Sequence, residues 1–236
     1  MPDASLQAVR AALRAEANAA DVAHLQRFFK TGPGEYAEGD RFLGVRVPAT
    51  RRIARAYRSL SLDDTLVLLR SRWHEERLLA LLLLVGAHAR ANDEGRVVIH
   101  DAYLAHTRYI NNWDLVDSSA AHIVGPHVTP DAIEPLEQLA RSADVWERRI
   151  AIIATFHWIR AGDFTPTLRI AELLLADRHD LIYKAVGWML REVGNRSRSA
   201  EEAFLRDHCR TMPRTMLRYA IEKFPEPLRK RYLTGA

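Results

Sequence analysis

Helical periodicity runs through almost the whole chain, and the polar–apolar alternation that marks β-strands is nearly absent. Apolar residues recur at spacings of three and four, the pattern of a helix with one buried face. The chain is therefore expected to be all-α, with glycine and proline separating the segments. The predicted helices cover residues 4–19, 22–30, 48–57, 62–70, 75–88, 97–106, 113–124, 130–141, 146–160, 165–176, 181–193, 201–209 and 213–223.

A weak internal repeat is visible among these helices. Similar helix openings recur every 33 to 40 residues, at Trp73, Asn112, Val145, Ile182 and Met216. This interval is typical of two-helix repeats such as HEAT and armadillo units, which bury their apolar faces by stacking. We therefore expect an α/α superhelix, a solenoid of HEAT-like repeats forming one domain over residues 1–236. A compact irregular helical bundle is the alternative.

Composition predicts a folded, soluble protein. Hydrophobic residues make up 48% and charged residues 27% of the chain, and the longest apolar stretch, residues 78–87, is about half of a membrane span. It is expected to be a buried helix. The first four residues resemble no secretion signal, so the expected location is the bacterial cytoplasm or nucleoid. Cys209 has no partner for a disulfide or a zinc site, and no metal or cofactor is expected.

The basic residues are almost all arginine. Of 34 basic residues, 30 are Arg and 4 are Lys, with a formal net charge of +4. The planar guanidinium group suits phosphate because it can donate two hydrogen bonds at once. A GC-rich coding bias explains the same ratio without any ligand, so the charge agrees with a polyanionic partner and does not establish one.

One segment interrupts the helical pattern. Residues 31–48 contain three glycines and a proline within nine positions, which predicts a long loop. Loops of this length are often functional. The alternative is a connector held in place by Tyr36, Phe42 and Leu43.

The most informative motif is Asn-Asn-Trp-Asp-Leu-Val-Asp at residues 111–117. Either asparagine can cap a helix, and Asp114 favours its first turn. Trp113 and Asp117 then lie one turn apart on the same face, where an aromatic ring beside a carboxylate could stabilise a cationic sugar or base. A core tryptophan with a solvated aspartate near a helix start explains the same spacing.

Two later segments add residues of the same kinds. Arg148 and Arg149 are adjacent near the start of one predicted helix, and Trp188 follows Gly187 within another. Glycine inside a helix costs roughly 1 kcal/mol relative to alanine, so Gly187 suggests the close approach of a neighbouring backbone or a ligand. Taken singly, paired arginines usually form a solvated face and a helical tryptophan usually belongs to the core.

Together these segments resemble the AlkD family of HEAT-like-repeat DNA glycosylases, also called the DNA alkylation repair family. The matching segments run in the family's order over nearly the whole chain: residues 27–30, 42–48, 112–117, 146–152, 184–192 and 218–223. The Trp-Asp-x-Val-Asp and Lys-Ala-x-Gly-Trp segments are the specific ones. Phe28 stands where the family often has tyrosine, and the 31–48 loop is longer than usual.

The resemblance implies a monomer that removes N3- and N7-alkylated purines from duplex DNA, with no metal or cofactor and without flipping the lesion out of the stack. Trp113 and Trp188 match the tryptophans that embrace the lesion's deoxyribose, and Asp117 matches the catalytic carboxylate. Arg149 matches the arginine of the cleft, with Arg148 as the alternative because the adjacent pair leaves the register open. The other residues expected to contact DNA are Lys184, Arg191, Phe28, Lys30 and Arg46.

Two other functions remain open at this point. A non-catalytic module could bind damaged or branched DNA, although it would not need Asp117 near phosphates that repel it. A HEAT-like scaffold for protein partners would instead present an acidic or apolar concave face.

Overall fold

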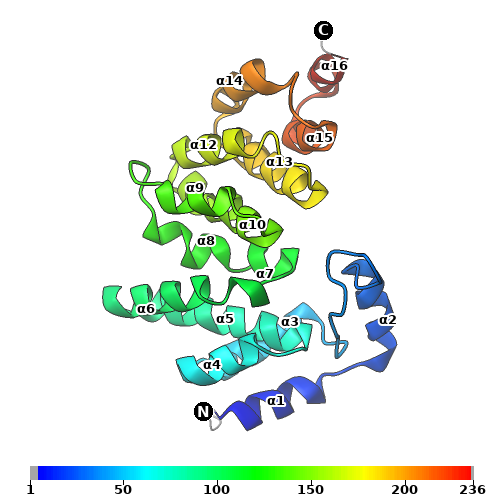
Figure 1. Cartoon of the computed structure of the whole chain (residues 1–236), viewed down its shortest axis with the longest axis vertical. Helices are drawn as coiled ribbons and strands as arrows, with labels where there is room; N and C mark the ends of the chain where they lie inside the picture. The colour runs from blue at the N-terminus through cyan, green and yellow to red at the C-terminus, as the bar shows by residue number, and fades with distance from the viewer. Residues whose placement is uncertain (1–4, 235–236) are drawn as a thin grey trace. The chain divides into compact units, whose positions relative to one another are not determined.

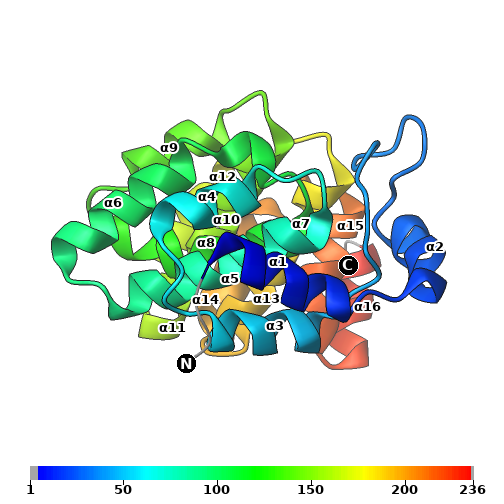
Figure 2. The same cartoon turned by 90° about the horizontal axis from the view of Figure 1, so that it is seen from below.

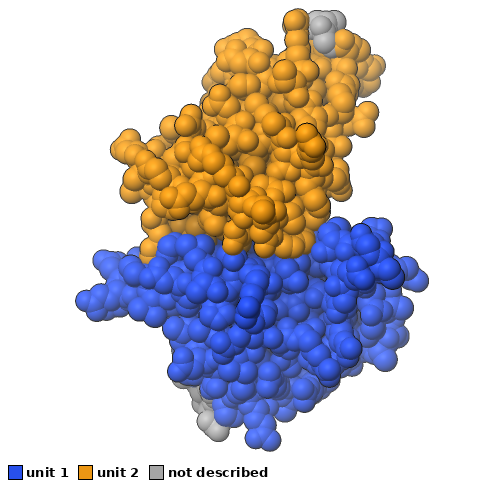
Figure 3. All heavy atoms as spheres, viewed as in Figure 1, with its two compact units in different colours: residues 1–123 blue, residues 124–236 orange. Residues whose placement is uncertain are grey.

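The computed structural model describes residues 5–234, so Ala4 and the rest of the first four residues lie outside it. Within 5–234 the chain is helical and has no β-strand, only isolated bridges at Arg41–Trp73 and Thr129–Ala132. The all-α prediction is confirmed (Figure 1). The helices form two compact units that meet in the sequence between Ile123 and Val124 (Figure 3). The single domain over 1–236 stays a prediction.

Unit 1 is built around one long apolar helix. Its described helices are α1 (Leu6–Ala15), α2 (Ala19–Phe28), α3 (Val47–Ala56), α4 (Leu62–Leu69), α5 (His74–Arg90), α6 (Asp93–Leu104), α7 (Trp113–Asp117) and α8 (Ala120–Ile123). Helix α5 packs against α3, α4, α6, α7 and α8. The stretch 78–87 lies within α5 and, as expected, forms the core, with Leu79 and Leu81 fully buried. A helix that is apolar on nearly all sides is stable only at such a central position.

Helix α2 and the loop after it lie at one edge of unit 1 (Figures 1 and 2). No residue of α2 is buried, whereas Phe29 directly after it is 7% exposed. The loop returns to the start of α2 at Gly44, whose positive φ of 84° and closeness to the carbonyl of Asn18, the N-cap of α2, leave no room for a side chain. Helix α3 begins at Val47, which was expected in the loop, and Pro48 lies in its first turn, in agreement with the helix predicted from residue 48, because proline suits the first turn of a helix.

Unit 2 consists of helix pairs that stack on one another. Its described helices are α9 (Glu134–Ala140), α10 (Val145–Ala154), α11 (Phe156–Ala161), α12 (Thr165–Leu173), α13 (Asp180–Gly194), α14 (Arg198–His208), α15 (Arg214–Ala220) and α16 (Glu226–Thr234). Helix α10 packs on its neighbour α9, and α13 on α12. The second helices of successive pairs also pack together, α10 on α13 and α13 on α15, as stacked helical repeats do.

Gly187 allows α13 and α15 to pack closely. A Cβ atom at Gly187 would lie 2.4 Å from the Met216 carbonyl oxygen and 2.5 Å from the Tyr219 Cβ. The predicted close approach of a neighbouring backbone is confirmed. We expect Gly187→Ala to lower the free energy of unfolding by about 1–3 kcal/mol through overpacking, although alanine is the better helix former.

Gly86 in α5 provides the matched control for this prediction. A Cβ there would meet only the flexible end of Arg90, at 3.2 Å. Gly86→Ala should therefore leave stability unchanged or raise it by up to about 1 kcal/mol. Chemical denaturation of both variants gives the comparison, and equal effects would refute the packing role of Gly187.

Two predicted helices are each interrupted at a hydroxyl residue. The predicted helix 113–124 is wrong as one piece: it is divided into α7 and α8, and Ser119 Oγ donates to the Leu115 carbonyl at 2.6 Å between them. The predicted helix 146–160 is likewise divided, where Thr155 Oγ1 donates to the Ile152 carbonyl at 2.7 Å. Side chains that bond back to carbonyls in this way compete with regular helix geometry.

Helix α16 was not predicted, because Pro225 and Pro227 were interpreted as helix breakers. Pro227 lies in the first turn of α16, where a helix loses nothing by the absence of a backbone N–H. The predicted helix 130–141 begins later, at Glu134, after the bridge at Thr129–Ala132.

Candidate functional site

Helix α7 carries the motif singled out in the sequence. It begins where the Asn112 side chain accepts a hydrogen bond from the Trp113 N–H at 2.8 Å, so the predicted asparagine cap is confirmed. Leu115 and Val116 are fully buried in unit 1. Trp113 and Asp117 are half-buried and four residues apart, which places both on one face of α7. A tryptophan and a carboxylate are thus both partly exposed on one face of unit 1.

An aromatic cluster holds Trp113 from the side of α2. Phe29 stacks on the indole with ring centroids 5.2 Å apart and planes 18° from parallel, and Phe28 meets the indole edge-on at 5.7 Å. Phe42 from the loop stacks on Phe29 at 5.1 Å. One indole face is therefore occupied, and only the part of Trp113 that remains exposed can contact a ligand. Phe28 itself is 55% exposed.

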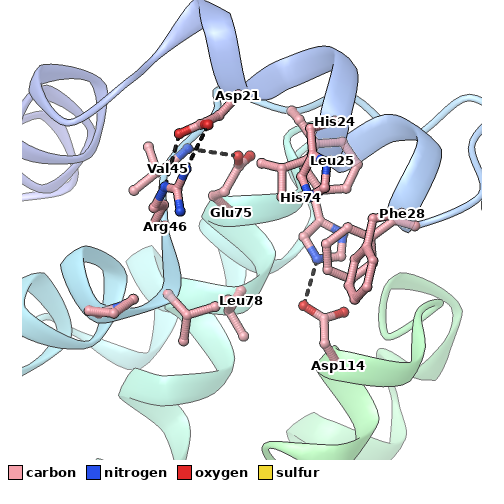
Figure 4. A pocket seen from close by; sticks show the side chains of 14 residues that line it. Asp21, His24, Leu25, Phe28, Val45, Arg46, His74, Glu75, Leu78 and Asp114 are labelled. Atoms are coloured by element: carbon pink, nitrogen blue, oxygen red, sulfur yellow. Dashed lines mark hydrogen bonds and ion pairs between the residues drawn. The ribbon is translucent and has the colours of Figure 1, made fainter.

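His74, the first residue of α5, connects this cluster to two carboxylates, of which Figure 4 shows Asp114. Its Nδ1 lies 3.1 Å from Asp40 in the loop, and its Nε2 lies 2.8 Å from Asp114 in α7. Arg77 donates to both oxygens of Asp40, at 2.6 and 2.8 Å. His74 is 2% exposed and Arg77 3% exposed. A buried network of two acids and two bases thus joins α5, α7 and the loop.

The two carboxylates stabilise positive charge on His74. Burial alone would lower its pKa, but Asp114 and then Asp40 outweigh burial and raise the pKa of His74 to about 9. The pKa of Asp40 is lowered, because hydrogen bonds and charge attraction from His74 and Arg77 outweigh the opposite effect of burial. His74 is therefore an imidazolium at neutral pH.

Glu75 fixes the end of the loop. Its carboxylate accepts the backbone N–H groups of Leu43, Gly44 and Val45 at 2.9–3.2 Å, and the side chain is 2% exposed. The neighbouring Glu76, 1% exposed, pairs with Arg10 of α1 at 3.0 Å. The polar opening of α5 therefore anchors α1, α7 and the loop at once.

A pocket with about 370 Å³ of space opens beside this network in unit 1. Arg46 lies at its rim and makes two hydrogen bonds to Asp21, at 3.0 and 2.8 Å, while its side chain stays 75% exposed (Figure 4). The walls are mostly apolar: Leu25, Phe28, Phe29, Phe42, Val45, Val47, Pro48 and Leu78, with Asp21, His24, Arg46, His74, Glu75 and Asp114 as the polar lining. Of the predicted DNA contacts, Phe28 and Arg46 thus share one pocket.

The two adjacent arginines of unit 2 have structural partners. Arg149 is 5% exposed and donates to the Leu181 carbonyl at 2.6 Å, which links α10 to α13. Arg148 pairs with Asp177 at 2.7 Å and donates to the carbonyls of Ser142 and Ala143. A phosphate contact by either arginine stays a prediction, and Arg148 is the more exposed of the two side chains, at 17%.

Trp188 lies half-buried on α13 of unit 2. Its Nε1–H donates to Glu192 at 3.3 Å, and Phe156 lies beside it with ring centroids 6.2 Å apart. Lys184 pairs with Asp180 one turn away, at 2.6 Å. Arg191 forms an ion pair with Glu222, and Lys30 of unit 1 approaches Glu35 at 3.9 Å.

The predicted site residues are thus divided between the two units. Unit 1 brings Trp113 and Asp117 together on α7 with Phe28 stacked edge-on against the indole, and unit 2 carries Arg149 and Trp188. The convergence of all four on one surface stays a prediction. Asp40, His74 and Glu75 were not predicted as site residues. The only signal for His74 and Glu75 was four consecutive polar residues, 74–77, opening an otherwise apolar helix, and this signal does not extend to Asp40.

Neither a membrane span nor a metal-ligating cluster occurs among the described residues. No helix among them is long and apolar enough to cross a membrane. No group of three or more His, Cys, Asp or Glu side chains within 5–234 could hold a metal ion.

Comparison with known proteins agrees with the resemblance in the motifs. The model of the family described as "DNA alkylation repair enzyme" matches residues 9–224. A solved structure described as a predicted DNA alkylation repair enzyme from Enterococcus faecalis has the same fold, with a TM-score of 0.67 and 14% sequence identity. The match covers 89% of this chain and 98% of that one. No curated protein matches the chain. Since the family model spans nearly all of the sequence, the chain belongs to the family of DNA alkylation repair enzymes.

Proposed function

We propose that the chain is a DNA glycosylase that releases N3- and N7-alkylated purines, such as 3-methyladenine and 7-methylguanine, from duplex DNA without flipping the base. The observation that carries this proposal is the pairing of Trp113 with Asp117 on one half-buried face of α7. Family membership supports a role in alkylation repair. The hydrolysis of an N-glycosidic bond is the proposed reaction, and base excision repair is the pathway class it serves.

Alkylation at N3 or N7 makes the purine a cation, so the base already leaves readily. When the bond between C1′ and the base breaks, both electrons go to the base, which departs neutral and needs no general acid. Positive charge then grows on the deoxyribose. Asp117 stabilises that charge by Coulomb attraction and orients the water that adds to C1′, as carboxylates do at oxocarbenium-like centres. The proton of that water passes to the solvent.

The two tryptophans contribute a smaller stabilisation. An indole face near a cation contributes about 0.5–2 kcal/mol. Because Phe29 covers one face of Trp113, the exposed part of that ring is the part available to the sugar. Trp188 would act from unit 2, with Arg149 or Arg148 holding a neighbouring phosphate. Lys30, Arg46, Lys184 and Arg191 would add contacts to the DNA backbone, and Phe28 would pack against it.

The charge on the base supplies the test of this mechanism. One duplex carries 7-methylguanine, a cation, and a matched duplex carries O6-methylguanine, which is neutral. We expect the protein to release 7-methylguanine and leave O6-methylguanine in place, because the proposed mechanism relies on the charge already on the base and protonates no leaving group. Chromatography of free bases measures both. Equal release of the two bases would contradict the mechanism.

A further inference from the structure

Both ring nitrogens of His74 face a carboxylate. Nδ1 lies 3.1 Å from Asp40 and Nε2 lies 2.8 Å from Asp114, and the residue is 2% exposed. The imidazole also stacks on Phe42, with ring centroids 4.6 Å apart, and contacts Phe29 at 4.8 Å in a tilted arrangement. These hydrogen bonds and ring contacts together fix its position.

This geometry requires a proton on each nitrogen of His74. An ionised carboxylate can only accept hydrogen bonds, and a neutral imidazole has one donor and one acceptor nitrogen. A neutral ring would therefore satisfy Asp40 or Asp114 but set a lone pair against the other. The charged form joins both, and in a buried site the loss of one such hydrogen bond is costly.

The connection matters because Asp114 directly follows Trp113 in α7. Helix α7 has only five residues, and a helix so short has little stability of its own. On the other side, Asp40 is held by Arg77 through two hydrogen bonds. The charged groups acting on His74 are thus Asp40 from the loop, Asp114 from α7, and Arg77 from α5 itself.

We propose that His74 is a positioning residue for base release: its imidazolium joins Asp40 to Asp114 and thereby fixes the first turn of α7, with Trp113 and Asp117, in the active orientation. The inference rests on the proposed glycosylase function. Loss of one proton from His74 breaks its hydrogen bond either to Asp114 of α7 or to Asp40 of the loop. In both cases α7 is no longer joined to the loop through His74, so the activity depends on that proton.

The expected consequence is an alkaline limb in the pH profile, that is, a fall in the rate of base release at high pH. Because the pKa of His74 is raised to about 9, the imidazolium persists at neutral pH and is lost as the pH passes through that value. We expect the single-turnover rate to fall about ten-fold between about pH 8 and about pH 10. Protonation of His74 also stabilises the fold. This contribution to the free energy of unfolding is complete below about pH 6.5, the pKa of His74 in the unfolded chain, and is lost as the pH rises through about 9.

Asp114→Asn is the decisive variant, because it removes the charge that raises the pKa of His74 most and keeps a side chain of the same shape. NMR titration of the imidazole C–H signal, assigned with His74→Gln, should show the pKa of His74 falling by about one unit or more. The alkaline limb should move by the same amount.

His74→Gln should lower the rate and have no limb near pH 9. His100→Gln, a histidine of α6 outside this network, should behave like the unmodified protein.

Failure of the inference and failure of the proposed function give different results. If the limb stays in place while the pKa of His74 moves, His74 does not position the site. If the unmodified protein releases no base at any pH, the glycosylase function is wrong. The inference is then still tested by the indole N–H signal of Trp113, which should shift with the titration of His74. A Trp113 signal that does not shift with that titration would overturn the inference.

Discussion

Replacing Asp117 by asparagine is expected to lower the release of 7-methylguanine by about 100- to 1000-fold, the scale of losing one electrostatic stabiliser. The carboxylate acts on positive charge that exists fully only in the transition state, so it contributes to the rate more than to binding. Affinity for alkylated duplex should stay the same or rise, because a negative charge near the phosphates has been removed. Binding and rate therefore move in opposite directions.

The structure also changes the alternative explanation of Asp117. As a residue near a helix start, it would stabilise the fold by interacting with the helix dipole, and its loss would cost about 0.5–1 kcal/mol. Asp117 is instead the last residue of α7, the end at which a negative charge is unfavourable. Its charge also lies near the buried Tyr103, whose pKa is raised by burial and, further, by Asp117. A dipole role at a helix start is thus excluded.

Three measurements on Asp117→Asn decide between catalysis and structure: the melting temperature, the affinity for duplex and the rate of base release. Asp93→Asn is the matched control, since it removes a fully exposed carboxylate from the same unit. It should leave the rate unchanged. Near-normal release by Asp117→Asn would remove this residue from the mechanism.

Replacing Glu75 by alanine is expected to lower the free energy of unfolding by about 3 kcal/mol or more. The substitution leaves the N–H groups of Leu43, Gly44 and Val45 without their acceptor, and the last two residues are buried. Each buried donor left unsatisfied costs about 1–3 kcal/mol. Chemical denaturation measures the loss, and faster amide exchange at 43–45 should accompany it.

Glu38→Ala is the control for Glu75→Ala within the same loop. Glu38 is exposed and accepts one backbone N–H, from Gly34 at 2.9 Å, which water can replace. Its loss should cost about 0.5 kcal/mol or less. Similar losses for the two variants would mean that Glu75 does not anchor the loop.

The fold could be predicted from the sequence because helical periodicity is a local property. The all-α class, the buried helix at 78–87 and the close approach at Gly187 follow from spacing and residue type. The breaks at Ser119 and Thr155 could not be predicted, since a hydroxyl in a helix often bonds to a carbonyl without ending it. Helix α16 was missed for the opposite reason, because proline both ends helices and begins them.

The candidate site could be predicted only where its residues are neighbours in the sequence. Trp113, Asp117 and the capping Asn112 lie within one motif, and the cap was found at the expected residue. The partners of His74 lie 34 and 40 residues away, at Asp40 and Asp114, and no local pattern connects them. A buried network of this kind depends on packing, which the sequence pattern does not describe.

The most direct test of the proposed function is the release of free 7-methylguanine from a methylated duplex by the unmodified protein in excess. Release at least about 100-fold faster than spontaneous depurination of the same duplex is expected, the smallest acceleration ascribed to one electrostatic stabiliser. Release at the spontaneous rate by a protein that still binds the duplex would contradict hydrolysis and leave a non-catalytic DNA-binding module.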